Sequence, residues 1–187
     1  MSTKQKLFSH FQSKNMKLPN RIVMAPMTRN FSPNNVPGDD VISYYRRRAQ
    51  GGVGLIITEG TCVNHIASNC YPNVPYIHGE ESITGWSNVV DAVHDVGGQI
   101  AAQLWHVGAV RKMGMPPNPE VNGYGPSGMN VPGKQNREIM TLQDIDLVIN
   151  AFVEAAITAK SIGFDAIELH GAHAVSYTHL RAHETQR

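Results

Sequence analysis

Residues 163–173 read Gly-Phe-Asp-Ala-Ile-Glu-Leu-His-Gly-Ala-His, and this stretch decides which fold the chain is expected to adopt. Phe164 to Leu169 is an apolar run of the length of a buried strand, entered through Gly163. His170 and His173 follow, where the backbone should leave the sheet. Two neutral imidazoles there can both donate hydrogen bonds to one acceptor, which makes them a candidate clamp on a substrate oxygen. Taken alone, the stretch favours a plainer interpretation, two histidines near a surface turn.

Three further apolar segments of strand length precede this one, at 21–27, 53–58 and 99–107. Pro26 has no N–H to donate to a sheet, so pairing of the first segment should stop near it. In the third segment Gln103 and Trp105 share one face, because successive side chains of a strand alternate. A glutamine and a tryptophan on one face can bond and stack on a heterocycle; locally, simple packing explains them as well.

Helical periodicity separates these strands. We expect a helix from Val41 to Gln50 capped by Asp39 or Asp40, and a second one through Trp86 to Gly97. A third helix should begin at Thr141 as its cap and end at Gly163. The predicted buried stripe of this third helix consists of Leu142, Ile145, Val148, Ile149, Phe152, Ala155, Ala156 and Ala159.

The order strand, helix, strand, helix, strand, helix, strand predicts parallel strands joined by crossover helices, hence an α/β fold. Candidate functional residues fall at the C-terminal ends of the strands, where both α/β barrels and open doubly wound sheets bind ligands. No Gly-x-Gly-x-x-Gly follows the first strand, so the barrel is favoured. These candidates are Thr28, Gly60, Gln103, Trp105, His170 and His173.

The bulk composition excludes several classes of protein. The chain has 187 residues, 41% of them hydrophobic, and a net charge of +1, which indicates neither a nucleic-acid partner nor an anionic membrane surface. No segment has the length of a signal peptide core or a membrane span, so a cytoplasmic location is expected. The spacing of Cys62 and Cys70 fits neither a zinc knuckle nor a redox pair, which indicates structural thiols. The Gly-, Pro- and Asn-rich segment 109–139 is typical of an active-site or binding loop.

Four segments together resemble the Old Yellow Enzyme family of flavin-dependent ene-reductases. They read Pro-Asn-Arg-Ile-Val-Met-Ala-Pro-Met-Thr-Arg at 19–29, Gly-Leu-Ile-Ile-Thr-Glu-Gly at 54–60, Gln-Leu-Trp-His at 103–106 and Glu-Leu-His-Gly-Ala-His at 168–173. The resemblance spans roughly residues 7 to 173. It implies a (β/α)8 TIM barrel that holds FMN non-covalently at the ends of its strands.

The resemblance also implies roles for single residues. The residues that it assigns to FMN are Ala25, Pro26, Met27, Thr28, Gly60 and Gln103. The backbone of the first three would lie along the flavin, and the Thr28 hydroxyl would bond the flavin carbonyl next to N5. Gly60 would contact the pyrimidine side of the ring, and Gln103 would bond its N3 and O2 edge. Trp105 and Tyr71 would shape the substrate pocket.

The implied mechanism passes hydride from NADH or NADPH through FMN to the β-carbon of an α,β-unsaturated carbonyl, a small enone-type substrate. His170 and His173 would hold the carbonyl oxygen and stabilise the negative charge that develops there. In the family a tyrosine two residues after the second of these positions protonates the α-carbon. Here position 175 is Val175.

After His173 the sequence departs from the family. Residues 174–187 have neither helical nor strand periodicity and resemble a translated sequencing adapter, which predicts a non-native tail. Residues 1–173 would then be the N-terminal half of a barrel, with about four of its eight βα units. Such a half is expected neither to fold stably alone nor to hold FMN tightly. Two alternatives remain open, a metal-dependent barrel hydrolase using His106, His170 and His173, or a non-functional fragment.

Overall fold

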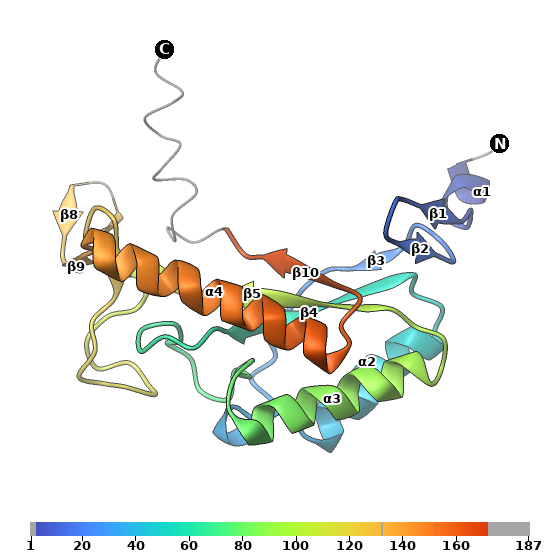
Figure 1. The fold of residues 1–187 in the computed structure, drawn as a ribbon, viewed down its shortest axis with the longest axis horizontal. Helices are drawn as coiled ribbons and strands as arrows, with labels where there is room; N and C mark the ends of the chain where they lie inside the picture. Colours follow the sequence, from blue (N-terminus) through green and yellow to red (C-terminus); the bar gives the residue numbers. More distant parts are fainter. Residues whose placement is uncertain (1–2, 132, 172–187) are drawn as a thin grey trace, which may run out of the picture.

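A four-stranded parallel sheet forms the centre of the computed structural model, which describes residues 3–131 and 133–171. The strand order is β10-β5-β4-β3, and each strand pairs with its neighbours in parallel. The strands are β3 (Val23–Met24), β4 (Leu55–Cys62), β5 (Ile100–Trp105) and β10 (Ala166–Leu169). The predicted α/β fold is therefore confirmed (Figure 1).

One long helix lies between each pair of consecutive strands of the sheet. These helices are α2 (Asp39–Gln50), α3 (Glu80–His94) and α4 (Leu142–Ile162), in the order that the sequence predicts. Their apolar sides meet the outer face of the sheet in one core, in which Trp86, Tyr45 and Ile56 are fully buried. The outside of an α/β barrel is built in the same way, with helices covering the outer face of a parallel sheet.

The helix ends were predicted with mixed success. At α4 the Thr141 side chain accepts from the Asp144 N–H, and the Asp144 side chain accepts from the Thr141 N–H, which completes a capping box. Gly163 ends this helix with a φ of 102°. The predicted cap of α2 by Asp39 or Asp40 is wrong. Gly38 occupies the cap position, and both carboxylates lie in the first turn, where they favour the helix dipole.

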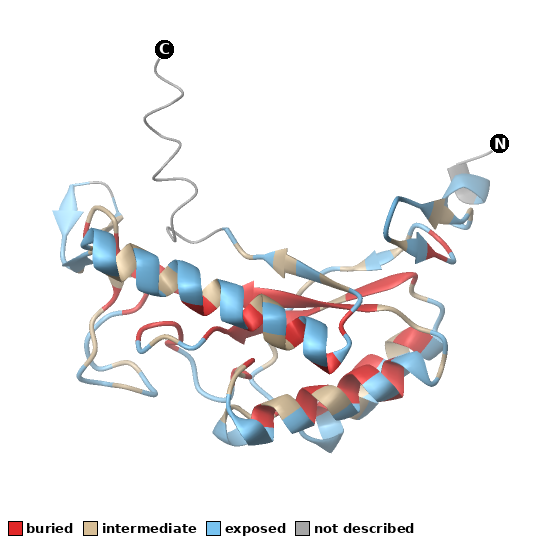
Figure 2. Cartoon of the chain, in the orientation of Figure 1, coloured by how far each residue is buried: buried red, intermediate tan, exposed pale blue. Residues whose placement is uncertain are grey.

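The opposite, inner face of the sheet is only partly covered. A hairpin of β1 (Phe11–Gln12) and β2 (Lys17–Leu18) follows the short helix α1 (Thr3–Leu7) and packs at one end of this face. Leu18 meets Leu55 and Ala101 there in a small second core. Figure 2 shows that β4 and β5 are buried while β3 and β10 at the edges are more exposed.

The remaining elements are short. They are η1 (Pro33–Asn35), η2 (Gly108–Val110), β6 (Tyr124–Gly125), β7 (Met129–Val131), β8 (Lys134–Gln135) and β9 (Glu138–Ile139). The last four strands pair within the segment 109–139, β6 with β9 and β7 with β8. The predicted long loop thus has some regular structure of its own.

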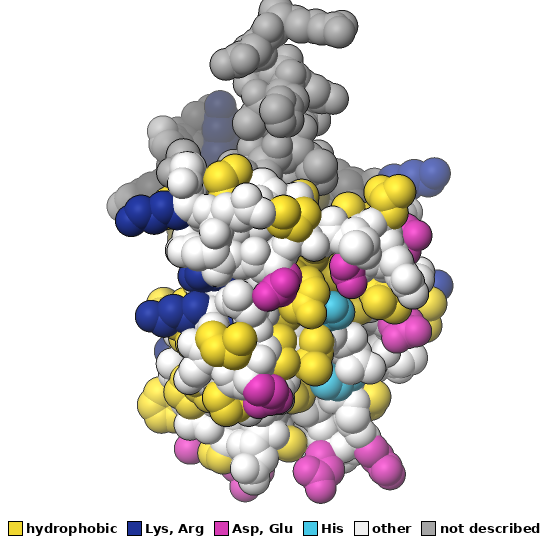
Figure 3. All heavy atoms as spheres, turned by 90° about the vertical axis from the view of Figure 1, so that its left-hand side faces the viewer, with side chains coloured by type: hydrophobic (Ala, Val, Ile, Leu, Met, Phe, Trp, Pro, Cys, Tyr) yellow, Lys and Arg dark blue, Asp and Glu magenta, His cyan; other side chains and the backbone are white. Residues whose placement is uncertain are grey.

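The predicted buried stripe of α4 is only partly correct. The buried residues of this helix are Ala151, Ala155, Ala159 and Ile162, whereas Leu142 is 82% exposed. Small side chains pack closely against the sheet and α3. The larger ones of the predicted stripe, such as Ile145 and Val148, instead line an apolar groove of about 590 Å³ beside Ile167 and Leu169 of β10. Figure 3 shows hydrophobic side chains gathered in a hollow on the side of the molecule that carries the start of α4.

Candidate functional site

The register of the strands places predicted site residues of neighbouring strands side by side on the inner face of the sheet. Gln103 of β5 pairs with Gly60 of β4 on one side and with Glu168 of β10 on the other. Trp105 lies further along β5, nearer the C-terminal ends of the strands, and His170 follows β10 with its N–H donated to Leu104 of β5. Side chains from separate strands therefore converge at one end of the sheet, where a parallel α/β barrel builds its active site.

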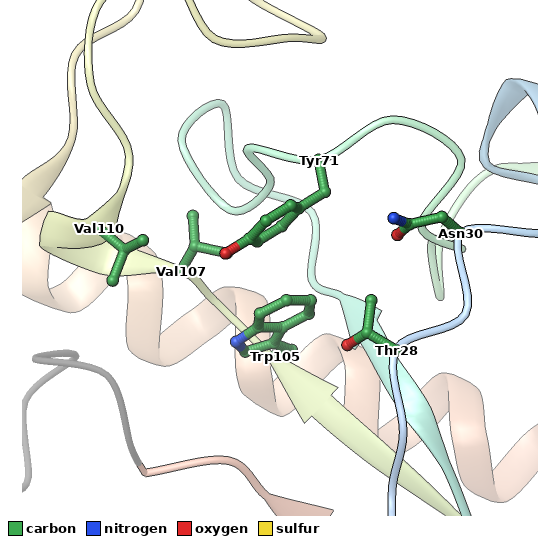
Figure 4. Close-up of a pocket in the computed structure, with 6 residues that line it drawn as sticks. All are labelled: Thr28, Asn30, Tyr71, Trp105, Val107 and Val110. Carbon is green, nitrogen blue, oxygen red and sulfur yellow. The ribbon is translucent and has the colours of Figure 1, made fainter.

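A pocket of about 290 Å³ opens at this end (Figure 4). The Tyr71 and Trp105 rings are stacked, with their centroids 5.7 Å apart and their planes 19° apart. Thr28 and Asn30 reach the pocket from the segment that follows β3, and they lie on the opposite side of the two rings from Val107 and Val110. The lining is completed by Val107 and Val110, so the pocket combines aromatic walls with a hydroxyl and an amide.

Trp105 is held on several sides. A Cβ built on Gly60 would lie 2.4 Å from Cε3 of the indole, so only glycine lets the ring lie this close to β4. The His170 ring meets the indole edge-on, with the centroids 5.8 Å apart and the planes at 78°. Tyr71 stacks on the same indole. Trp105 thus links the pocket wall to the histidine that the sequence predicts as a substrate contact.

A β-bulge in β4 changes where Gly60 lies. The register shifts between Ile57 and Gly60, and β4 continues to Cys62. Gly60 therefore lies inside the strand, whereas the sequence pattern predicts a strand that ends at Thr58. The Thr58 hydroxyl accepts from the Gln103 N–H at 3.0 Å, and the Thr61 hydroxyl donates to the Gln103 carbonyl at 2.9 Å. These two bonds fix the backbone of Gln103 against the bulge.

Glu59 supports the pocket from behind and was not predicted. Its N–H donates to the Tyr45 hydroxyl at 2.8 Å, and its Oε2 accepts from the Arg29 N–H at 3.0 Å. Burial raises the pKa of Glu59, although the hydrogen bond from the Arg29 backbone opposes the change. The carboxyl group tethers the segment that carries Thr28 and Asn30. A glutamate after the apolar run Leu-Ile-Ile-Thr is the sequence signal that could have shown it.

Arg111 was also missed, and it organises the loops around the pocket. Its side chain is fully buried, and its guanidinium donates to five backbone carbonyls. One of these carbonyls belongs to Asn69, two residues before Tyr71. The other four belong to Met115, Pro116, Asn118 and Val121. The guanidinium thereby ties the start of the segment 109–139 to the loop that presents Tyr71.

His106 lies outside this pocket, where it is fully buried and paired with the half-buried His65. Its Nδ1 accepts from the Gly108 N–H at 2.9 Å, so its Nε2 carries the proton and donates to His65 Nδ1 at 2.9 Å. Burial lowers the pKa of His106 to about 3, with a smaller contribution from His65. Within the described ranges 3–131 and 133–171, no group of three or more His, Cys, Asp or Glu side chains is placed to hold a metal ion.

The two cysteines behave as the sequence predicts. Cys62 and Cys70 are both free and buried. Burial raises the pKa of both thiols, which suppresses the reactive thiolate form. They pack with Trp105 and Val107 in a small apolar cluster beneath the pocket.

The structure brings most of the predicted site together. Thr28, Tyr71 and Trp105 line one pocket, and His170 and Gly60 contact or adjoin the Trp105 ring. Ala25, Pro26 and Met27 lead from β3 to Thr28, with Ala25 and Met27 exposed. Gln103 lies two residues before Trp105 on β5, farther from the ends of the strands, and is only 5% exposed. His173 lies outside the described residues.

The fold and the site define a class, an α/β-barrel protein with its binding site at the carboxyl ends of parallel strands. The chain belongs to the NADH:flavin oxidoreductase / NADH oxidase family, which matches residues 6–177. Similar curated proteins include the putative 12-oxophytodienoate reductase 4 of Oryza sativa subsp. japonica, 35% identical over 89% of this chain and 45% of the relative. The putative 12-oxophytodienoate reductase-like protein 1 of Arabidopsis thaliana is 41% identical over 86% of this chain and 50% of its own length.

Solved structures give the same result. Morphinone reductase in complex with tetrahydroNAD superposes with a TM-score of 0.81 at 34% identity, over 90% of this chain and 50% of that one. The Old Yellow Enzyme homologue of Zymomonas mobilis gives 0.79 at 30% identity, over 91% and 49%. The predicted family is confirmed, and for that family FMN with NADH or NADPH as reductant is confirmed as well.

The extent of the match agrees with the predicted half barrel. The chain spans about half the length of the curated relatives and solved structures that it matches. Four parallel strands with three crossover helices are likewise half of an eight-stranded barrel. In the part of the chain that the structure describes, no helix combines the length and apolar character that a bilayer span requires.

Proposed function

We propose that this chain supplies the first half of the active site of an FMN-dependent ene-reductase, which reduces α,β-unsaturated carbonyl compounds with NADH or NADPH. The observation that carries the proposal is the convergence of Thr28, Gly60, Gln103, Trp105 and His170 at one end of the parallel sheet. Each of them comes from one of the four strands or the segment that follows it. The names of the similar reductases, for 12-oxophytodienoate and morphinone, both denote ketones, which supports a carbonyl substrate.

The residues present fit a flavin. At Gly60 the space that a side chain would take is filled by the Trp105 indole, so the fit to a flavin rests on the polar groups beside it. Gln103 offers a donor and an acceptor in one group, as the pyrimidine edge of a flavin requires, and Thr28 adds an exposed hydroxyl. The backbone of Ala25, Pro26 and Met27 runs between β3 and this hydroxyl. When bound, FMN supplies the hydride chemistry that no side chain of this site offers.

The protein side chains would bind and orient the substrate. His170 donates a hydrogen bond to the substrate carbonyl oxygen and stabilises the negative charge that develops on it, and we assign His173 the same role by resemblance. Tyr71 and Trp105 form the walls that hold the conjugated system flat and exclude water. Arg111 holds the loop that carries Tyr71, and the Glu59 carboxyl holds the segment that carries Thr28, each through hydrogen bonds to the backbone.

Proton delivery to the α-carbon is not provided by residue 175, because a valine side chain has no exchangeable proton. We infer that residues 174–187 are a non-native tail and that the natural chain carries another residue at this position. Sequencing the source locus tests the inference. The same tail in genomic DNA, followed by a stop codon in frame, would refute it.

The experiment that tests the function uses the full-length product of the reading frame. We expect a yellow protein that releases FMN on denaturation, is bleached by NADH or NADPH, and is reoxidised by 2-cyclohexenone. His170→Ala should slow the reoxidation by the enone by about 10²-fold or more. It should leave bleaching by the nicotinamide largely intact. His10→Ala, which changes an exposed histidine far from His170 in the sequence, is the matched control. A well-folded protein that is colourless and indifferent to added FMN would overturn the proposal.

A further inference from the structure

A carboxylate points to the inner face of the sheet beside the proposed flavin site. Along β10 the residues Ala166, Glu168 and His170 share this face, since strand side chains alternate. Glu168 is the register partner of Gln103 on β5. Its Oε1 accepts a hydrogen bond from Gln103 Nε2 at 2.7 Å.

This bond determines which way the Gln103 amide faces. A carboxylate only accepts hydrogen bonds, so the amide nitrogen must point toward β10 and the amide oxygen away from it. The reversed amide would place two oxygens against each other. One N–H and both lone pairs of the Gln103 oxygen then remain for a ligand.

The position of the Gln103 backbone does not depend on Glu168. The hydroxyls of Thr58 and Thr61 already bond its N–H and carbonyl. Glu168 therefore controls the orientation of the amide alone, which separates its contribution from the stability of the sheet.

We propose that Glu168 is a positioning residue of the flavin site, and this proposal rests on the proposed function. It fixes the Gln103 amide so that the oxygen accepts the N3–H of a flavin and the remaining N–H donates to flavin O2. Without Glu168 the amide rotates, and half of its orientations set donor against donor. Glu168 acts only through Gln103 and is not required to contact the cofactor.

A double-mutant cycle on the full-length protein tests this role, with FMN titrated into the apo form. Because one hydrogen bond contributes about 1 kcal/mol, Glu168→Ala should raise the Kd for FMN about fivefold, and Gln103→Ala should raise it at least as much. In the Gln103→Ala background the Glu168 substitution should have no further effect. Glu154→Ala, on the exposed side of α4, is the control and should leave the Kd unchanged.

A modified flavin gives a readout that a general loss of stability would not move. The wild type should prefer FMN over N3-methyl-FMN about tenfold, because the methyl group removes the donor that Gln103 accepts from. In Glu168→Gln, which keeps the side-chain shape and so protects folding, this preference should fall to about twofold. An unchanged preference, or an effect of Glu168→Ala that persists in the Gln103→Ala background, would overturn the positioning role alone. A wild type that binds no FMN would overturn the proposed function as well.

Discussion

The contact between Gly60 and Trp105 makes Gly60→Ala the sharpest test of the pocket geometry. The added Cβ would lie 2.4 Å from Cε3 and 2.8 Å from Cδ2 of the indole, whereas carbon atoms in contact lie about 3.5–4.0 Å apart. The backbone of Gly60 does not adopt the left-handed region, so the methyl group itself causes the conflict. The indole must shift by about 1 Å, and Tyr71, stacked on it, must shift too.

The cost of this substitution follows from the packing. Forcing an extra methyl group into a filled site costs about 1–3 kcal/mol, and replacing a glycine returns about 0.4–1 kcal/mol through the unfolded chain. We therefore expect a net loss of about 1–2 kcal/mol in the free energy of unfolding. Urea unfolding of the full-length product, followed by circular dichroism, measures it, and the tryptophan fluorescence of the folded state should change because Trp105 moves.

Gly38→Ala is the matched control, since no atom lies within 4 Å of the Cβ position at Gly38. Because Gly38 is the N-cap of α2, where alanine is less favourable than glycine, the substitution should cost about 0.5–1 kcal/mol and leave the tryptophan fluorescence unchanged. Equal stability of the Gly60→Ala and Gly38→Ala proteins, with an unchanged fluorescence spectrum, would show that Trp105 does not rest on Gly60 and would refute the pocket geometry.

Three further predictions concern the supports of the fold. Arg111→Ala should destabilise the full-length protein by about 3 kcal/mol or more in urea unfolding, because five backbone carbonyls, one of them fully buried, lose the donor that they share. Thr141→Ala should cost about 1 kcal/mol through the lost capping box, while Thr84→Ala on the exposed side of α3 should not. The depressed pKa of His106, about 3, means that its contribution to stability is present above about pH 6.5 and is lost as the pH falls toward 3. His106→Gln should flatten this fall, which amounts to up to about 1.4 kcal/mol per pH unit, in unfolding curves measured across that range.

Features set by neighbouring residues were predictable from the sequence. The start of α4 at Thr141 depends on a side chain three residues away, and its end depends on the left-handed backbone of Gly163. The end of β4 depends on more distant contacts. Its polar residues Glu59 to Thr61 suggest a loop, yet pairing with β5 keeps them in the sheet through a bulge. Local pattern rules do not include that pairing energy.

The residues of the candidate site also fall into those that the local sequence pattern predicts and those that depend on distant contacts. Thr28 and Gln103 follow from their places near strand ends, which the order of elements already fixes. The Tyr71–Trp105 stack joins a loop residue to the last residue of β5, and the pattern of strands and helices alone does not place the two side by side. Arg111 resembles a solvated loop charge in the sequence. Its burial becomes visible only when the carbonyls that satisfy it are in place, because an isolated buried charge would be too costly.

The pattern of burial across the sheet explains why the site residues are so unequally exposed. The central strands β4 and β5 are almost completely buried, while Val23 of β3 is 46% exposed and Leu169 of β10 is 63% exposed. In a closed barrel every strand has two neighbours, so this fall in burial from the centre to both edges is what four strands of eight produce. Residues on the inner strands, Gly60 and Gln103, are held in final form by contacts within this chain. Thr28 and His170 lie at the edges, where fewer contacts from this chain hold them, so the contact that we propose between Gln103 and a flavin should be the most preformed part of the site.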